Sequence, residues 1–470
     1  MPDRPAAPLP RTCVIGAGSS GLPVIKALLD RGLPVTCYER TPHVGGLWCI
    51  DNKRFGASAA YDSLHINTDT KLMEYQDFPM PEDLPAYPSH RQIHEYFRAY
   101  VGRFGLAEHI RFGVAVERCR RLDDGRWEVT LAGDERETFD ALVIATGHHW
   151  DPQGPEPAPP GHFDGLQIHS HLYRNPGEPV DMRGRRIVVV GLGNSAVDIA
   201  TELGSRAVAE RVFLSVRRGA WILPKWVGGT PITRLPEPQR LFPWMPWQVT
   251  SLMMGLIMRL SVGRPSDYGL PMPDHRPLQS HPTVSQDLLS RIGHGDIAIK
   301  PPIRALDGDG VVFEDGSREP ADVIVWCTGY RVSFPFLGPE VLEVSDNVVP
   351  LWTRTVLPGV DNLFFVGLYQ PLGSIMQPAE LQARVIGEYL LGHIAFPEEA
   401  RMRRDIEAER RAMERRYLRS RRHTMQVDFG PFMHRLRRLL VDGRRLAAQP
   451  GSMRLGARHA AAPHTLETTP

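Results

Sequence analysis

Cysteine is scarce in this sequence, with five residues among 470. A small, odd number of thiols argues against a disulfide framework. No two cysteines form a CxxC pair, which excludes dithiol–disulfide relay chemistry. Net charge is also low, because 55 Lys and Arg oppose 54 Asp and Glu. This balance argues against a nucleic-acid partner and gives no reason to expect an anionic membrane or a polyanionic substrate.

Long hydrophobic runs are missing as well. The most apolar stretch, residues 242–262, contains two prolines, Gln248 and Arg259. These leave about ten uninterrupted residues, whereas a bilayer span needs about 20. We expect a buried or tunnel-lining helix there, the alternative being a surface patch that touches a membrane or guides an oily substrate. Residues 1–10 lack the apolar segment of a signal peptide. These absences predict a cytoplasmic protein without a transmembrane anchor.

A first dinucleotide-binding pattern lies near the N-terminus. A strand at 12–15 is followed by a glycine turn, a helix to about residue 31 and a strand that ends at Glu39. The glycine turn reads Gly16, Ala17, Gly18, Ser19, Ser20, Gly21. Its three glycines fit a tight turn, a close approach of backbone to pyrophosphate and close packing of helix on strand. Glu39 stands where a carboxylate can hold a ribose 2′-hydroxyl, so we expect a dinucleotide here.

The same pattern returns at residue 186. A strand at 187–190 leads into the turn Gly191, Leu192, Gly193, Asn194, Ser195, Ala196 and a helix to about residue 203. The next strand ends in Arg217 and Arg218 instead of an acid. A guanidinium group can pair with a 2′-phosphate that a carboxylate would repel, although two surface arginines are the alternative. The two patterns together predict FAD and NADPH as cofactors, with hydride transfer from NADPH to the flavin. No metal site is predicted.

The order of these elements predicts an α/β fold. Strands at 141–145 and 323–326 both lead into a Thr-Gly pair and mark where the chain leaves one domain and returns to it. We therefore expect two Rossmann-like dinucleotide-binding domains, with the NADPH domain inserted into the FAD domain. The expected boundaries are 1–170 for the first part of the FAD domain, 171–329 for the NADPH domain with an inserted helical substrate-access segment around 221–290, 330–445 for the return to the FAD domain and C-terminal helices, and 446–470 for a disordered tail. Within the third part, residues 397–423 are rich in Arg and Glu and indicate a solvated helix.

Several motifs resemble those of one protein family. The segment 163–173 (FDGLQIHSHLY) resembles the fingerprint of the flavin-containing monooxygenases, which include the closely related Baeyer–Villiger monooxygenases. The elements GGLW at 45–48, CTGY at 327–330 and HPTVSQDLL from residue 281 are similar to further family motifs, as is the segment around Asn67. Tyr173 stands where the Baeyer–Villiger branch usually has Trp, which places the chain nearer the flavin-containing monooxygenases. The resemblance implies that His169 joins the domains and is not a catalytic base.

The resemblance also implies a set of site residues. It assigns a catalytic role to Asn67, whose amide could bridge bound NADP⁺ and the flavin. It adds to the FAD site Gly46, Leu47, Trp48, Asn67, Thr68, Thr146, Gly147 and Gln370, and to the NADP site Ile66, Asn67, Val197 and Asp198, beside Gly191, Gly193, Asn194, Ser195 and Ala196.

The implied reaction is oxygen transfer from a C4a-hydroperoxyflavin to a soft nucleophile, a nitrogen- or sulfur-containing compound. The alternatives are Baeyer–Villiger oxidation of ketones, N-hydroxylation, and a non-oxygenating FAD-binding redox protein. The Trp-, Pro- and Met-rich stretch at 221–268 suggests an apolar small-molecule substrate besides O₂. Because family members are often dimers, a homodimer is a further expectation.

Overall fold

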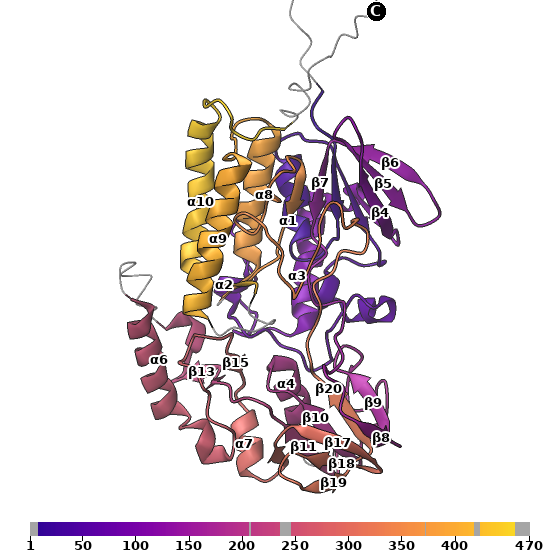
Figure 1. Cartoon of the computed structure of the whole chain (residues 1–470), viewed down its shortest axis with the longest axis vertical. Helices are drawn as coiled ribbons and strands as arrows, with labels where there is room; N and C mark the ends of the chain where they lie inside the picture. The colour runs from indigo at the N-terminus through magenta and orange to yellow at the C-terminus, as the bar shows by residue number, and fades with distance from the viewer. Residues whose placement is uncertain (1–7, 206–207, 236–245, 372, 418–423, 456–470) are drawn as a thin grey trace, which may run out of the picture.

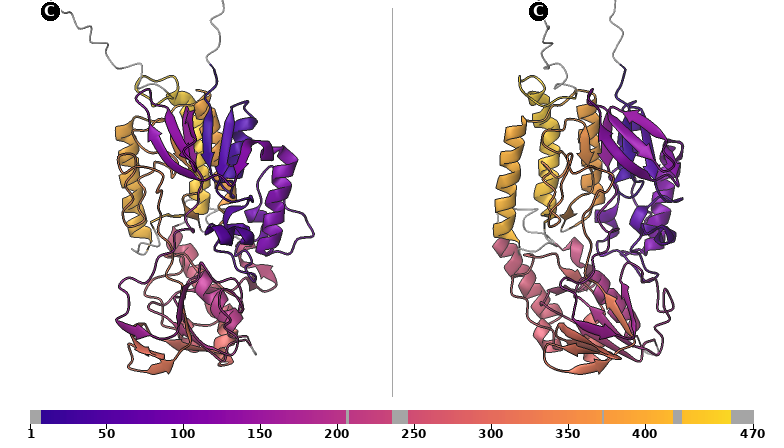
Figure 2. Two further views of the ribbon diagram at one scale, coloured as in Figure 1. Left: turned by 90° about the vertical axis from the view of Figure 1, so that its right-hand side faces the viewer. Right: turned by 45° about the vertical axis from the view of Figure 1, so that its right-hand side comes forward.

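The computed structural model describes residues 8–205, 208–235, 246–371, 373–417 and 424–455. It has two lobes stacked along the long axis, each built around a parallel sheet (Figure 1). The first lobe contains both the N-terminal third of the chain and its C-terminal helices, and the second lobe lies between them in sequence (Figure 2). The predicted α/β fold with one Rossmann-like unit inserted into another is confirmed.

The sheet of the first lobe is five-stranded and entirely parallel. Its order is β21 (Leu363–Phe365), β7 (Ala141–Ile144), β1 (Thr12–Ile15), β2 (Val35–Glu39) and β3 (Ile110–Phe112). All residues of β1, β7 and β21 are buried, as expected for strands that are covered on both faces. β21 follows the second lobe in the sequence, so the sheet of the first lobe contains strands from both sides of that lobe.

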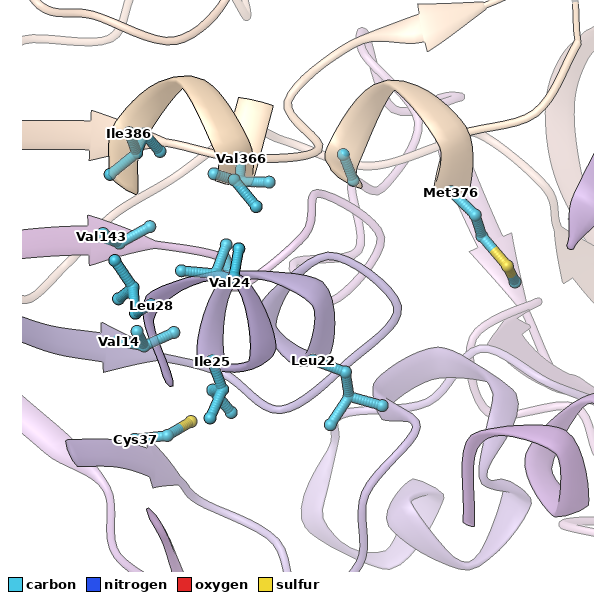
Figure 3. Close-up of a cluster of buried hydrophobic side chains, with 14 of the residues drawn as sticks. Val14, Leu22, Val24, Ile25, Leu28, Cys37, Val143, Val366, Met376 and Ile386 are labelled. Carbon is cyan, nitrogen blue, oxygen red and sulfur yellow. The ribbon is translucent and has the colours of Figure 1, made fainter. Parts of the chain in front are cut away.

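The core of the first lobe occupies both faces of this sheet. On one face, α1 (Gly21–Leu29) packs between the strands and α8 (Met376–Leu390), with Leu22, Val24 and Ile25 in the same buried cluster as Met376 and Ile386 (Figure 3). α3 (His90–Phe104) adds to that cluster. On the other face lies an antiparallel meander of β4 (Val116–Arg121), β5 (Trp127–Leu131) and β6 (Arg136–Phe139).

The second lobe repeats the arrangement. Its parallel sheet has the order β16 (Ile297–Lys300), β11 (Arg211–Ser215), β10 (Arg186–Val190), β20 (Val323–Trp326) and β9 (Leu166–His169). One face is covered by α4 (Asn194–Leu203) and α7 (Leu288–Gly293). A second sheet packs on the other face, with β19 (Arg318–Pro320), β18 (Gly310–Phe313), β17 (Ile303–Gly308) and β8 (Gly161–Phe163).

Two chain segments connect the lobes and run side by side. The Gln153 N–H donates to the Gly329 carbonyl and the Arg331 N–H to the Asp151 carbonyl, both at 2.9 Å. The Arg331 guanidinium also pairs with the Asp151 carboxylate at 3.0 Å. Because β8 and β9 already belong to sheets of the second lobe, the chain crosses between the lobes before the expected boundary at residue 170.

The inserted segment around 221–290 is only partly helical. It contains the short strands β12 (Ile222–Leu223), β13 (Trp226–Val227), β14 (Thr230–Pro231) and β15 (Thr283–Val284), and the helix α6 (Trp247–Ser261). The expectation of a buried or tunnel-lining helix is wrong for α6, because Leu252 and Leu260 are 76% and 80% exposed. Only Thr250, Ser251 and Met258 of that helix are buried. Residues 242–245 of the apolar stretch lie outside the described residues.

The C-terminal part adds two long helices to the first lobe. α9 (Glu399–Arg416) has one buried residue, Met402, and i,i+4 ion pairs such as Arg403–Glu399 at 2.7 Å, which confirms the prediction of a solvated helix over these residues. Residues 418–423 of the predicted segment lie outside the described residues. α10 (Phe429–Leu446) packs on α8, and β22 (Gln370–Pro371) pairs with β23 (Gln426–Val427). The expected disordered tail begins at 446, yet Met453 pairs with Phe396, so its first part, up to residue 455, is ordered; residues 456–470 lie outside the described residues.

The remaining short elements are α2 (Thr70–Met73), η1 (Gly46–Trp48), η2 (Ile50–Phe55), η3 (Leu106–His109), η4 (Ile232–Arg234) and η5 (Pro265–Tyr268). Over the described ranges, no helix combines the length and the apolar character that a membrane span requires.

Candidate active site

The first glycine turn joins the central strand β1 to α1 and has no room for side chains at two of its positions. A Cβ on Gly21 would stand 1.8 Å from the Gly16 carbonyl oxygen. A Cβ on Gly16, whose φ is +101°, would stand 2.8 Å from the Ala145 carbonyl oxygen. Helix and strand therefore approach as a dinucleotide fold requires, and the start of α1 directs backbone N–H groups towards the turn.

Glu39 closes this turn from the end of β2. Its buried carboxylate accepts hydrogen bonds from the Ala17 N–H (2.8 Å), the Thr41 hydroxyl (2.7 Å) and the Thr41 N–H (3.0 Å). Because an ionised carboxylate offers about four acceptor positions, one remains for a ribose hydroxyl. Glu39 thus also shapes the loop, which the sequence pattern did not reveal.

The GGLW element lies against the same turn. The Gly45 N–H donates to the Ala17 carbonyl at 3.0 Å, and a Cβ on Gly18 would be 3.7 Å from the Cα of Gly46. Leu47 and Trp48 are partly buried, and Trp48 packs against the core of the first lobe. Backbone of both glycine elements therefore lines one space, as a bound pyrophosphate would need.

The buried polar atoms without a hydrogen-bond partner among the described residues include Oδ1 of Asn67 and Oγ1 of Thr146. Thr146 follows β7, and its Cα would be 3.3 Å from a Cβ on Gly16. Buried polar groups are nearly always paired in native proteins, so these two atoms are suited to meet a ligand. With the glycine cradle and Glu39, they show that the residues present fit a bound FAD.

The other residues predicted for this site differ in their exposure and in the hydrogen bonds that hold their backbone. Ile66 is buried, with its N–H bonded to the Pro88 carbonyl at 3.1 Å, and Thr68 is partly buried. Gly147 is exposed at the connection between the lobes. Gln370 is held in β22 by its N–H bond to the Met425 carbonyl at 2.7 Å. Ser19 and Ser20 complete the glycine turn, and Ser20 is buried.

The second glycine turn joins β10 to α4 and is held from the inserted segment. The Val284 N–H donates to Oδ1 of Asn194 at 2.8 Å, and the Thr283 hydroxyl donates to the Leu192 carbonyl at 2.6 Å. Ala196 is fully buried beside Gly191, which explains the small residue at that position. Gly193 and Ser195 are partly exposed, whereas Val197 is fully buried, so only its backbone is available to a ligand.

Asp198 of α4 points towards the first lobe. Its carboxylate accepts a hydrogen bond from the Tyr61 hydroxyl at 2.5 Å. Burial raises the pKa of Asp198 to about 6, although the Tyr61 bond and Lys225 act in the opposite direction. The segment that precedes Asn67 is therefore bonded to the helix of the second glycine turn, which the sequence motifs did not indicate.

Arg217 and Arg218 follow β11 at its carboxyl end. Both are exposed, and the described residues give neither of them an ion-pair partner. Asp274 lies near enough that Arg218 helps to lower its pKa, after the larger effect of the His275 hydrogen bond. Two unpaired guanidinium groups at the end of this strand are suited to a 2′-phosphate.

His169 lies in the second lobe at the end of β9, and Tyr173 lies in the core of the same lobe. His169 ends β9, and its Nδ1 accepts from the His171 N–H at 3.0 Å. Tyr173 is fully buried, and its hydroxyl donates to Oε2 of Glu202 at 3.0 Å. Neither ring is placed beside Asn67 by any hydrogen bond, and the linker role of His169 stays a prediction.

Sequence reasoning missed two side chains that hold these loops. The Tyr75 hydroxyl donates to the Ser19 carbonyl at 2.6 Å, and the Lys225 ammonium donates to the Ile66 carbonyl at 3.2 Å. Tyr75 lies close to the Asn67 segment in the sequence, but nothing in the sequence shows that its hydroxyl bonds the Ser19 carbonyl. Lys225 is one of only five lysines, and that scarcity was the one available signal.

Other chemistry finds no support in the described residues. They contain no group of three or more His, Cys, Asp or Glu that could hold a metal ion. All five cysteines are free, and burial raises the pKa of Cys13, Cys37 and Cys327, which makes poor nucleophiles of these thiols. A cavity of about 560 Å³ lies beside Arg186 and Arg211, the first residues of β10 and β11. It therefore lies away from the carboxyl ends of those strands, where both glycine turns are found.

Comparison with known proteins agrees with this geometry. The family model "Flavin-binding monooxygenase-like" matches residues 10–445. The chain is 37% identical over 437 residues to flavin-containing monooxygenase 5 of Rattus norvegicus, covering 89% of this chain and 80% of that protein. It is 38% identical over 428 residues to the N-oxide-forming dimethylaniline monooxygenase 2 of the same species, covering 85% and 76%.

Solved structures show the same architecture. S-allyl-L-cysteine S-oxygenase from Allium sativum matches with a TM-score of 0.68 and 25% identity, covering 93% of this chain and 91% of that one. An NADP⁺-bound cyclohexanone monooxygenase from Rhodococcus matches with a TM-score of 0.68 and 18% identity, covering 94% and 99%, and shows likeness of fold alone. The chain belongs to the flavin-binding monooxygenase-like family and is an oxidoreductase of the flavin-containing monooxygenase type, with FAD and NADPH as its cofactors.

Proposed function

We propose that this monooxygenase oxygenates soft nucleophiles, that is, nitrogen- or sulfur-containing organic compounds, with NADPH and O₂ as co-substrates. The observation that carries the proposal is the Asn67 amide, whose buried Oδ1 has no partner in the described structure. It lies on a segment of the first lobe that is bonded twice to the second lobe, through Tyr61 to Asp198 and through Ile66 to Lys225. The names of the N-oxide-forming and S-oxygenating relatives support the same substrate class.

The proposed roles follow from the chain's own groups. The first glycine turn and Glu39 bind FAD, and the second turn with Arg217 and Arg218 binds NADPH. When bound, the reduced flavin supplies the oxygen-activating and oxygen-transferring chemistry. Asn67 has both an amide donor and an acceptor, so it can hold bound NADP⁺ and stabilise charge that develops beside the flavin. Buried surroundings keep water from the reacting atoms, which prevents loss of oxygen as H₂O₂.

Replacing Asn67 tests this role directly. Asn67→Ala should still allow NADPH to reduce the flavin but should raise the share of NADPH that ends as H₂O₂ about tenfold, because removing one such donor typically costs two to three orders of magnitude in the step that it stabilises. Product and H₂O₂ formed per NADPH give the ratio. Asn67→Asp keeps the shape and loses the donor, so it serves as the isosteric partner variant. Wild-type coupling in Asn67→Ala would remove Asn67 from the mechanism.

Analysis of the products distinguishes the proposed reaction from the two enzymatic alternatives, Baeyer–Villiger oxidation and N-hydroxylation. A sulfide, a tertiary amine, a primary amine and a ketone are supplied in turn to the same enzyme. S-oxide and N-oxide formation supports the proposal, ester formation alone would indicate a Baeyer–Villiger enzyme, and hydroxylamine formation alone would indicate an N-hydroxylase. Tyr173 favours the first outcome, because the Baeyer–Villiger branch usually has Trp at the matching position.

Three finer expectations accompany the proposal: an apolar substrate, a homodimer and a cytoplasmic location. The first concerns the inserted segment 221–268, whose helix α6 exposes its apolar side chains. Sedimentation of the FAD-loaded enzyme measures the second.

A further inference from the structure

The loop that carries Asn67 is bonded on both sides to the inserted segment of the second lobe. On one side, the Lys225 ammonium donates to the Ile66 carbonyl at 3.2 Å. On the other side, Asp69 accepts from the Thr233 hydroxyl at 2.6 Å and from the Arg234 guanidinium at 3.1 Å. Asn67 therefore lies between two polar contacts that join the lobes.

Lys225 is itself fixed before it reaches the loop. Its carbonyl accepts from the Tyr87 hydroxyl at 2.6 Å and from the Ile232 N–H at 2.9 Å. Its N–H donates to Oε1 of Gln286 at 3.1 Å. The side chain runs over the Tyr87 ring, with the ammonium nitrogen 5.2 Å from the ring centre. These contacts leave Lys225 few conformations. Its hydrogen bond therefore fixes where the Ile66 carbonyl lies.

Two carboxylates partly offset the cost of burying the Lys225 charge. Burial lowers the pKa of Lys225, while the carboxylates of Asp198 and Asp287 oppose that effect. Asp198 belongs to α4, the helix of the second glycine turn, and the Ile66 carbonyl precedes Asn67. The Lys225 ammonium thus lies between the helix of the second glycine turn and the loop that carries Asn67.

The Asn67 loop needs such support, because residues 66–69 precede the first turn of α2 and belong to no helix or strand of their own. The loop's own lobe holds it through the Ile66 and Thr70 N–H groups, which donate to the carbonyls of Pro88 and Ala86 at 3.1 and 3.2 Å. A catalytic amide loses much of its effect when it is displaced by about 1 Å, so contacts that fix this backbone affect the reaction.

We propose that Lys225 is a positioning residue, which fixes the Ile66 carbonyl and thereby holds the Asn67 amide in its productive place when the two lobes are together. Lys225 acts through Asn67, and the Asp69 contacts with Thr233 and Arg234 complete the clamp. This inference rests on the proposed function, since it gives Asn67 the role stated above.

The first test does not depend on turnover. Amide hydrogen exchange of the FAD-loaded enzyme with NADP⁺ is measured for wild type, Lys225→Met and Lys71→Met. Lys71 carries an equal charge four residues after Asn67, but its side chain is 59% exposed and lies next to Glu74 at 3.8 Å. Lys225→Met should speed exchange of the Ile66 and Thr70 amides about tenfold, because the loop opens more easily, and Lys71→Met should leave it unchanged. Equal protection in all three proteins would overturn the proposal.

The second test asks whether Lys225 acts through Asn67. Lys225→Met should raise the share of NADPH lost as H₂O₂ several-fold while anaerobic reduction by NADPH stays within about twofold of wild type, and Lys225→Arg should restore much of the coupling. The double variant Lys225→Met/Asn67→Ala should be no less coupled than Asn67→Ala, because residues that act as one unit are not additive. If the losses of coupling caused by the two single substitutions multiply in the double variant, the proposal is overturned.

A direct role in holding NADP⁺ is distinguished by calorimetry. Lys225→Met should change the NADP⁺ dissociation constant of the oxidised enzyme by less than about threefold, whereas loss of a direct charged contact would weaken binding tenfold or more. The larger change would make Lys225 a ligand residue and overturn the positioning role. If wild type yields only H₂O₂, the proposed function fails, while the exchange experiment still decides whether Lys225 fixes the loop.

Discussion

We propose that the preference for NADPH over NADH depends on Arg217 and Arg218. Both guanidinium groups are exposed just beyond β11, at the same edge of the sheet as the second glycine turn. In an exposed position, a guanidinium contributes little to folding, and its charge is free to pair with a phosphate. We therefore expect substitutions of these two residues to change cofactor selection and to leave stability nearly unchanged.

Arg217→Ala should raise the KM for NADPH about 10- to 100-fold, because charge-assisted hydrogen bonds contribute about 1.5–3 kcal/mol each. The KM for NADH, which has no 2′-phosphate, should change by less than about twofold. Arg211→Ala is the control, since Arg211 is also exposed but begins the same strand at its other end. Steady-state kinetics with both cofactors measures the effect, and an equal rise for NADPH and NADH would contradict the assignment.

Ionisation of the buried Asp198 carboxylate lowers the stability of the folded protein, and this effect depends on pH. Burial raises its pKa in the folded chain from the ordinary 3.8 to about 6. The folded state therefore binds more protons than the unfolded state between about pH 4 and pH 6, and stability falls as pH rises through that range. With about 1.4 kcal/mol for each pKa unit, the ionised carboxylate costs up to about 3 kcal/mol above pH 6.

Asp198→Asn should remove this pH-dependent cost while it keeps an acceptor for the Tyr61 hydroxyl. Its Tm relative to wild type should therefore be higher at pH 7.5 than at pH 4.5, as measured by thermal unfolding at both values. Asp322→Asn provides the control. The hydrogen bond from Arg186 lowers the pKa of Asp322 below the ordinary 3.8, so this carboxylate is ionised in the folded and the unfolded state at both pH values, and the Tm difference of that variant should be nearly the same at pH 4.5 and pH 7.5. A constant Tm difference for Asp198→Asn would show that its carboxylate is not destabilised.

At the scale of elements, the strand–turn–helix unit was the most predictable part of the structure. Glycine spacing and continuous apolar strands predicted β1 with α1 and β10 with α4. The reason is local: a Cβ on Gly21 would overlap the Gly16 carbonyl, so only one residue type permits the turn. Such constraints are visible in sequence because they involve neighbours in the chain.

Gly21→Ala should disrupt this turn and with it the retention of FAD. The added methyl group would lie 1.8 Å from the Gly16 carbonyl oxygen, so the backbone proposed to contact the pyrophosphate must shift. The purified variant should hold less than about a tenth of the wild-type FAD per chain, as read from flavin absorbance after gel filtration. Gly102→Ala is the control, because Gly102 lies in α3 and a Cβ added there would meet nothing within 4 Å. Wild-type FAD content in Gly21→Ala would contradict the loop assignment.

Helix α6 shows where element-level prediction stopped. Its apolar composition suggested burial, yet Leu252 and Leu260 are largely exposed, while Met258 packs with Leu223, Ile232 and Val284. Hydrophobicity reports which residues can be buried, but it does not say which elements are present to cover them. The sequence also did not show that β8 and β9 belong to sheets of the second lobe, because the residues of a short strand do not indicate which sheet it joins.

At the scale of the whole molecule, the contacts that position Asn67 could not be predicted. Tyr61 and Asp198 are 137 residues apart, and Ile66 and Lys225 are 159 residues apart. No motif spacing describes such pairs, because they arise only when the two lobes and the inserted segment come together. The glycine turns, Glu39 and Asn67 were found by pattern and resemblance, whereas Lys225, Tyr75 and the Asp198–Tyr61 pair needed the fold.

The central claim is that the two lobes together carry out NADPH-dependent oxygenation, and one measurement tests it most directly. The FAD-loaded enzyme is reduced anaerobically with NADPH and then mixed rapidly with oxygenated buffer while absorbance is recorded. We predict a long-lived near-ultraviolet band distinct from oxidised flavin, which decays faster when a sulfide or an amine is present. Immediate return of the oxidised flavin spectrum with stoichiometric H₂O₂ would contradict the claim and indicate an oxidase or a non-oxygenating flavoprotein.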